Sequence, residues 1–157
     1  MSLGGGGGGG GAMEEIQQQM EALEQEKQAI EAEIGGVRDE QAEIDEAVEA
    51  IGTLETASTV QVPLGGGAYL RAEVQDIDEI VVGLGGGYAA EQDQDGAIDA
   101  LERKRDALDE RIEDLREEIA EVETETEQLE QRAQQMQQQQ MQQMMQQQQQ
   151  QEQGDDE

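Results

Sequence analysis

Apolar residues recur at alternating steps of three and four residues along the first part of the chain. This series begins at Met13 and continues to Ile51, and only Lys27 and Gln41 interrupt it. Such a period is the heptad pattern of a coiled-coil seam. Gly52 follows the last apolar position and suits the turn after a helix C-terminus. The pattern therefore predicts a coiled-coil helix over residues 13–52.

A second heptad series begins at Ile98 and continues to Met136, with Arg105 as its one charged member. Asp93 and Asp95 both precede it, and either could cap the helix. The pattern predicts a second helix over residues 93–135. Because the two helices have similar lengths, we expect them to fold back on each other as an antiparallel pair. Gln41 would then lie near Arg105, so that two polar interruptions meet and fix the register.

The segment between the helices, residues 53–92, has a period of two, which is typical of β-strands. Two tips of the form Leu-Gly-Gly-Gly, at 64–67 and 84–87, lie twenty residues apart and predict two β-hairpins. Isolated hairpins are marginally stable and have open edges. We therefore expect the strands of several chains to form a shared β body. The strand residues expected at this oligomerisation surface are Val60, Val62, Leu64, Tyr69, Leu70, Val74, Ile80, Val82, Leu84 and Tyr88.

Both ends of the chain are of low complexity. Residues 1–12 are mostly glycine, which predicts a flexible tail. Residues 136–157 are rich in Gln and Met and end in acidic residues, which predicts frayed helix or disorder.

Charge and composition exclude several classes of function. The net charge of −30 disfavours binding to nucleic acid or to an anionic membrane. Since the chain has no His and no Cys, we expect no enzyme, no cofactor and no metal centre. Repulsion between so many carboxylates is screened at molar salt, so the acidity indicates a salt-rich cytoplasm. An acidic, partly disordered protein is the alternative interpretation, although the regular heptads argue against it.

Two motifs resemble ligand-binding loops. The glycine tips lack the Gly-Lys-Ser/Thr ending of a phosphate loop and are better explained as tight turns. Residues 91–102 match an EF-hand calcium loop at several positions, although Glu91 replaces the usual first Asp. A capped helix start explains the same carboxylates.

Methionines gather at the ends of the helices that lie farthest from the strands. Met is flexible and polarisable, so it suits surfaces that accept varied apolar segments. We therefore expect unfolded client proteins to bind there; ordinary seam packing and a mobile tail are the alternative. The residues expected to bind clients are Met13, Ile16, Met20, Leu23, Leu129, Met136, Met141, Met144 and Met145.

The strand region resembles a known family. Its segments VPLGGGAYLRA (62–72) and VVGLGGGYAAE (81–91), flanked by two long helices, are similar to the α-type subunits of archaeal prefoldins over about residues 13–135. The resemblance implies an α+β, mainly helical fold: an antiparallel coiled coil whose two hairpins join an intersubunit β-barrel.

The resemblance also implies a function. It implies a hexamer of two α and four β subunits, which holds unfolded polypeptides at coiled-coil tips without ATP and passes them to a group II chaperonin. The competing hypotheses are a coiled-coil scaffold that tethers folded partners and a calcium-responsive binding module.

Overall fold

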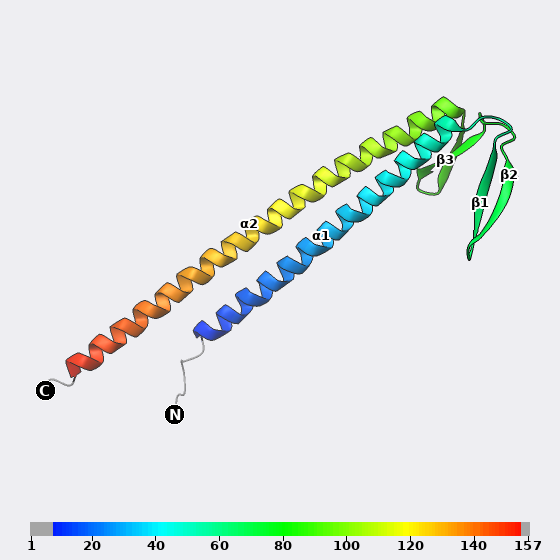
Figure 1. Ribbon diagram of the computed structural model, residues 1–157. Coiled ribbons are helices and arrows are strands. Elements are labelled where there is room, and N and C mark those ends of the chain that lie inside the picture. The colour runs from blue at the N-terminus through cyan, green and yellow to red at the C-terminus, as the bar shows by residue number, and fades with distance from the viewer. Residues whose placement is uncertain (1–7, 155–157) are drawn as a thin grey trace. The chain divides into compact units, whose positions relative to one another are not determined.

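The computed structural model describes residues 8–154 as two long helices separated by two β-hairpins (Figure 1). The elements follow in the order α1 (Gly8–Thr53), β1 (Thr59–Gly65), β2 (Ala68–Glu73), β3 (Ile80–Gly85), β4 (Tyr88–Gln92) and α2 (Gln94–Gly154). The predicted architecture of two helices and two hairpins is confirmed.

The chain divides into two compact units. Among the described residues, the helical unit comprises residues 8–33 of α1 and 115–154 of α2. The strand unit comprises residues 34–114, which include the four strands and the adjoining halves of both helices.

The predicted seam is where the helices bury side chains. All twelve heptad positions of α1 from Met13 to Ile51 are buried or half-buried, and so are eleven of the twelve in α2, Arg105 being the exception. Ile30 and Val122 are buried in the helical unit, and Ile44 and Ile112 in the strand unit. Removal of this apolar stripe from water is the main force that holds each helix pair together.

A polar interruption of the seam is satisfied by hydrogen bonds. The side-chain amide Nε2 of Gln41 donates to the backbone oxygen of Arg105 at 3.2 Å and to Oδ1 of Asp109 at 2.6 Å. The Arg105 side chain turns outward and forms an ion pair with Asp45 at 3.1 Å. The expected meeting of Gln41 and Arg105 is confirmed, and these directional bonds favour one register of the helix pair.

The other polar seam residue of α1, Lys27, lies in the helical unit. Its Nζ is 3.1 Å from Oε1 of Glu123. The hydrogen bond to this carboxylate and its negative charge raise the pKa of Lys27 above the ordinary value. The seam therefore carries a paired charge here.

Asp93 caps the N-terminus of α2. Its Oδ1 accepts a hydrogen bond of 2.7 Å from the backbone N–H of Gly96, and its backbone oxygen accepts the first helical bond from Ala97. A Cβ at position 96 would lie 2.6 Å from that carboxylate oxygen, so glycine permits the close approach. Of the two predicted caps, Asp93 is the one used. The segment resembling a calcium loop is thus the end of β4 and the start of α2.

Gln94 ties the start of α2 to the end of α1. Its Nε2 donates to the backbone oxygens of Ile51 at 2.7 Å and Leu54 at 3.1 Å. These carbonyls lie at the end of α1, where the helix itself offers no donor.

Replacing Gln94 with Ala should therefore lower the free energy of unfolding by about 1–2 kcal/mol, because two part-buried acceptors lose their donor. Denaturant unfolding followed by circular dichroism in molar KCl measures this change. The same substitution at Gln131, an exposed residue of α2, is the matched control. Equal stabilities of the two variants would contradict the assigned role.

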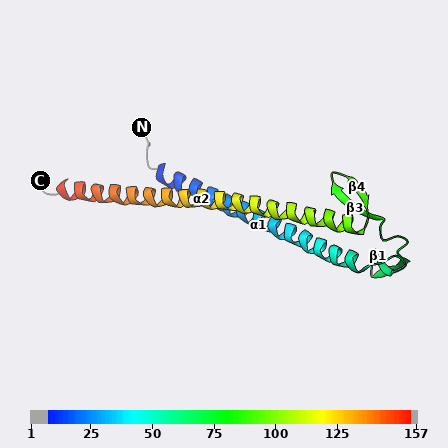
Figure 2. The same cartoon turned by 90° about the horizontal axis from the view of Figure 1, so that it is seen from above.

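The hairpins form two separate antiparallel sheets of two strands (Figure 2). Val62 lies opposite Leu70 in the first, and Val82 lies opposite Ala90 in the second. The glycines of both tips have positive φ: 101°, 61° and 83° at 65–67, and 91°, 61° and 82° at 85–87. Residues with a Cβ adopt this region at a cost of roughly 1–2 kcal/mol each, which explains the repeated glycines.

The helices extend beyond the predicted limits, which is a correction at both ends. α1 begins at Gly8, inside the expected glycine tail over 1–12, and α2 continues to Gly154, through most of the segment 136–157 expected to be frayed or disordered. Gln and Met are good helix formers, and each residue added to an existing helix gains one hydrogen bond. Residues 1–7 and 155–157 lie outside the described part of the chain.

Gly35 and Gly36 lie in the interior of α1 and weaken it. A Cβ at either position would meet no atom within 4 Å. Replacing both with Ala should therefore raise the melting temperature of the helical signal at 222 nm, since each exchange favours the helix by up to about 1 kcal/mol. Gly52→Ala, in the last turn of α1, is the control and should gain less. A double variant that melts no higher than the parent chain would contradict this prediction.

Candidate functional site

The first hairpin presents an uncovered apolar face. Side chains alternate between the faces of a strand, so Val62 and Leu64 of β1 share a face with Leu70 of β2. These three side chains are 41%, 66% and 54% exposed. Val60 and Val74 are half-buried, and Tyr69 is exposed on the opposite face. Exposed apolar surface of this kind typically marks an interaction site.

The second hairpin divides its apolar residues differently. Val82 is buried, whereas its neighbour Val81 is 70% exposed. Leu84 and Tyr88 near the glycine tip are exposed, and Ile80 is half-buried. Val82 is thus already covered within the chain, and Val81 is an exposed apolar residue that the alternation of Ile80, Val82 and Leu84 had assigned to the other face.

Both hairpins also have open edges. Because each sheet contains two strands, every strand is paired on one side only. The outward N–H and C=O groups are available to a strand from another chain. The strand unit therefore combines exposed apolar side chains with unpaired backbone, as expected for strands that complete a larger sheet.

In the helical unit, the seam opens into a groove of about 340 Å³ between α1 and α2. Leu23 and Leu129 line it, and both are half-buried. Its remaining lining is mostly polar or charged and consists of Gln19, Ala22, Glu26, Glu125, Gln128 and Arg132. The sequence predicted the two leucines as client-binding residues but not this rim, because the rim residues lie outside the heptad positions.

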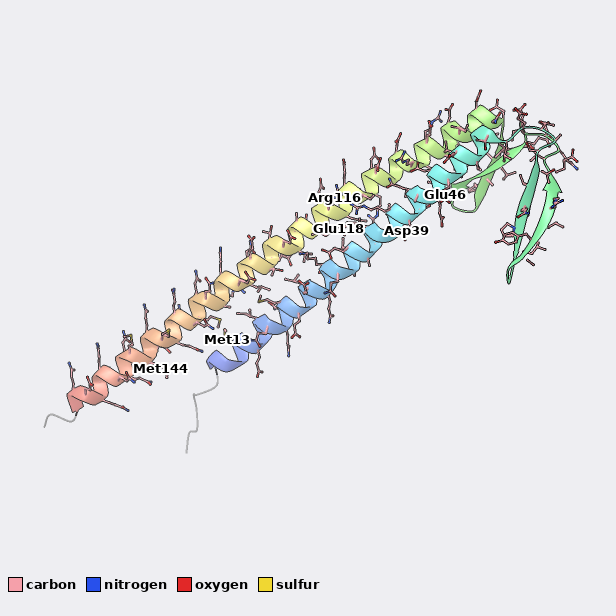
Figure 3. All side chains as sticks on the ribbon, in the orientation of Figure 1. Met13, Asp39, Glu46, Arg116, Glu118 and Met144 are labelled. Atoms are coloured by element: carbon pink, nitrogen blue, oxygen red, sulfur yellow. The ribbon has the colours of Figure 1, made fainter. Side chains whose placement is uncertain are left out.

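The other predicted client-binding residues of the seam differ in exposure. Ile16 is 6% exposed and packs within the helical unit, so a client could reach it only if the helices separated. Met13, Met20 and Met136 are half-buried. Figure 3 shows Met13 near the start of α1.

The last part of α2 carries three exposed methionines. Figure 3 shows Met144 on this part of α2. Met141, Met144 and Met145 are 68%, 68% and 66% exposed, and every residue from 137 to 154 is exposed. Their spacing of three and four places them on one face of the helix. We call these three residues the Met face. It is the most accessible part of the predicted client surface.

Negative charge predominates in the helical unit. Its described residues include fifteen Glu but only Lys27, Arg116 and Arg132 as cations. Across residues 8–154, no group of three or more acidic side chains is arranged to hold a metal ion. The same range contains no helix apolar enough over its length to cross a bilayer.

Comparison with known proteins agrees with the fold. The family model described as "Prefoldin subunit" matches residues 12–139. "Prefoldin subunit alpha" of Haloarcula marismortui is 63% identical over 115 residues, which are 73% of this chain and 75% of that protein. The protein of the same name from Halorubrum lacusprofundi is 70% identical over 80 residues, covering 51% of this chain and 53% of the relative.

A solved structure has a similar fold. A chain of the cryo-EM structure of filamentous PFD from Methanocaldococcus jannaschii aligns with a TM-score of 0.50 and 28% identity, covering 75% of this chain and 94% of that one. With a family model that spans most of the sequence and relatives from halophilic archaea at 63–70% identity, this chain belongs to the prefoldin family of chaperones and is similar to its α subunits.

Proposed function

We propose that this chain is the α-type subunit of an ATP-independent chaperone that captures unfolded polypeptides on the helical unit and passes them to a group II chaperonin. The observation that carries this proposal is the presence of uncovered apolar side chains on a strongly acidic helix pair: the Met face and the groove at Leu23 and Leu129. An unfolded client exposes apolar segments, and flexible methionines can pack against many of them. Capture of this kind requires no nucleotide and no catalytic residue.

The strand unit supplies the assembly in this proposal. The apolar faces and open edges of the two hairpins would pair with β-type subunits, giving a hexamer of two α and four β chains with a shared β-barrel. Several helical units could then engage one client together. Each contact can be weak, because linked sites raise the effective concentration of the next one.

The acidity supports the setting that we propose, the salt-rich cytoplasm of a halophilic cell. The relatives come from halophilic archaea. At about 1 M salt the Debye length is about 3 Å, so repulsion between the carboxylates of neighbouring arms is largely screened.

The test is an aggregation assay in molar KCl without nucleotide. The chain assembled with a β-type subunit should suppress aggregation of a chemically denatured protein after dilution. Replacing Met141, Met144 and Met145 with Gln should weaken this suppression, because Gln preserves the helix but removes the apolar face. Native mass spectrometry checks that the assembly is intact.

The matched control replaces three exposed glutamines of the same segment, Gln139, Gln143 and Gln146, with Ala. If the assembly binds a folded partner but leaves the denatured protein to aggregate, the scaffold interpretation replaces the chaperone proposal.

A further inference from the structure

The end of α2 is unlike the rest of the chain in its charge. Residues 133–151 contain no charged side chain, in a protein whose net charge is −30. Acidic residues lie on both sides of this uncharged segment, with Glu130 before it and Glu152 after it. It is therefore the longest surface on which two copies of this chain can approach without bringing carboxylates together.

Among the described residues, 8–154, the same segment has no partner within its own chain. All side chains from 137 to 154 are exposed, although the helix continues to Gly154. A helix without tertiary packing is marginal in water, since most helical stability in proteins comes from burying one face. The Met face offers such a face, with three apolar side chains about two-thirds exposed.

We infer that the Met face pairs with the Met face of a second copy of this chain, with the two helices antiparallel, so that two arms are joined end to end. In this arrangement Met141 of one copy packs beside Met145 of the other, and the two Met144 residues lie on either side of the centre, about 3 Å apart along the helix axis. The glutamines that flank them can exchange side-chain hydrogen bonds, because each amide both donates and accepts.

The distribution of acidic residues along the chain favours a second copy of this chain as the partner of the Met face. It also favours an antiparallel over a parallel arrangement of the two helices. A parallel pair would lay the two helical units side by side, each with fifteen Glu and three cations, and would place Glu152 against Glu152. Like charges at that distance are destabilising. An antiparallel pair centred near residue 143 places Glu152 of each copy beside Gln134 of the other, within the uncharged segment, and directs the acidic parts of the two chains away from each other.

The Met face also belongs to the proposed client surface, so pairing and client capture should compete. Pairing itself does not rest on client capture, and it is tested without a client.

The chain has no cysteine, so a single introduced cysteine is a unique probe. Gln137 and Gln148 lie one turn before Met141 and one turn after Met144, on the same face. In the antiparallel pair, position 137 of one copy lies beside position 148 of the other. A mixture of full-length chains carrying Gln137→Cys or Gln148→Cys should form a disulfide-linked dimer of the two variants when oxidised with copper phenanthroline in molar KCl.

Each variant alone should stay uncross-linked, because its own two cysteines would be about 15 Å or more apart along the axis, beyond the reach of a disulfide. Gln139→Cys mixed with Gln146→Cys is the opposite-face control and should also give no dimer. Adding Met141→Gln, Met144→Gln and Met145→Gln to the cross-linking pair should reduce its yield to the level of this control.

The salt dependence gives an independent readout. The cross-linked yield should fall as KCl is lowered, since repulsion between the acidic arms then extends farther. A denatured client should also lower the yield by occupying the Met face.

Two results would overturn the inference. Dimers of Gln148→Cys alone would indicate parallel pairing. Absence of any dimer, together with loss of aggregation suppression when the Met face is replaced, would show that the face binds clients only. If the assembly failed to suppress aggregation of the denatured protein but the cross-linked dimer still formed, the proposed function would be rejected and the pairing would stand.

Discussion

Replacing Val62, Leu64 and Leu70 with Ser is expected to abolish assembly while leaving the helices folded. These side chains share one exposed face of the first hairpin, and burying each against another subunit contributes about 1.5–3 kcal/mol. Losing all three should weaken association by several powers of ten. Native mass spectrometry with a β-type subunit should then detect separate chains, and circular dichroism should still detect helix.

The matched control is on the opposite face of the same hairpin. Gln61 and Arg71 lie opposite each other there, so replacing them with Ser changes two strand positions without removing apolar side chains. This variant should assemble normally. Deletion of residues 63–82 is the stronger form of the experiment, and a complex that kept its original mass after that deletion would refute assembly through the hairpins.

Transfer from about 2 M to about 0.05 M KCl is expected to remove much of the helical signal, because the Debye length grows from below about 3 Å to more than 10 Å. The chain has thirty-nine acidic residues and nine basic ones. The ion pairs Lys27–Glu123, Lys104–Glu40 and Arg105–Asp45 are exposed or half-exposed. Such pairs contribute little to stability. The seam alone must therefore resist the repulsion between carboxylates.

Circular dichroism at 222 nm, recorded at a series of KCl concentrations, measures this loss. Sucrose added to the sample in about 0.05 M KCl is the control, since it strengthens apolar burial without screening charge. Helicity that stayed constant over the whole series would exclude adaptation to salt as the reason for the acidity.

The heptads predicted the helices well because burial of a stripe is a local property of sequence. Even the meeting of Gln41 with Arg105 followed from counting along two antiparallel helices. The helix ends were predicted less well. Low-complexity Gln and Gly stretches carry no apolar period, so neither the start at Gly8 nor the continuation to Gly154 could be inferred from pattern.

The exposure of individual side chains was harder to predict than the helices and strands. Alternation shows that Val81 and Val82 lie on opposite faces, but not which face the chain itself covers. Ile16 is a seam residue like Met13 and Met20, yet it is buried and they are half-buried. The groove at Leu23 and Leu129 depends on how two distant segments pack, which the spacing within one helix does not report.

The central claim is that unfolded clients are held on the helical unit and not on the strand unit. A photoreactive amino acid introduced singly at position 23, 144 or 46 tests it directly, within the full assembly in molar KCl and without nucleotide. Positions 23 and 144 lie in the groove and on the Met face, and Glu46 is an exposed residue of α1 in the strand unit. We expect light to attach a denatured client at positions 23 and 144 and to leave position 46 unlabelled. Equal labelling at all three positions, or labelling at 46 alone, would contradict the account.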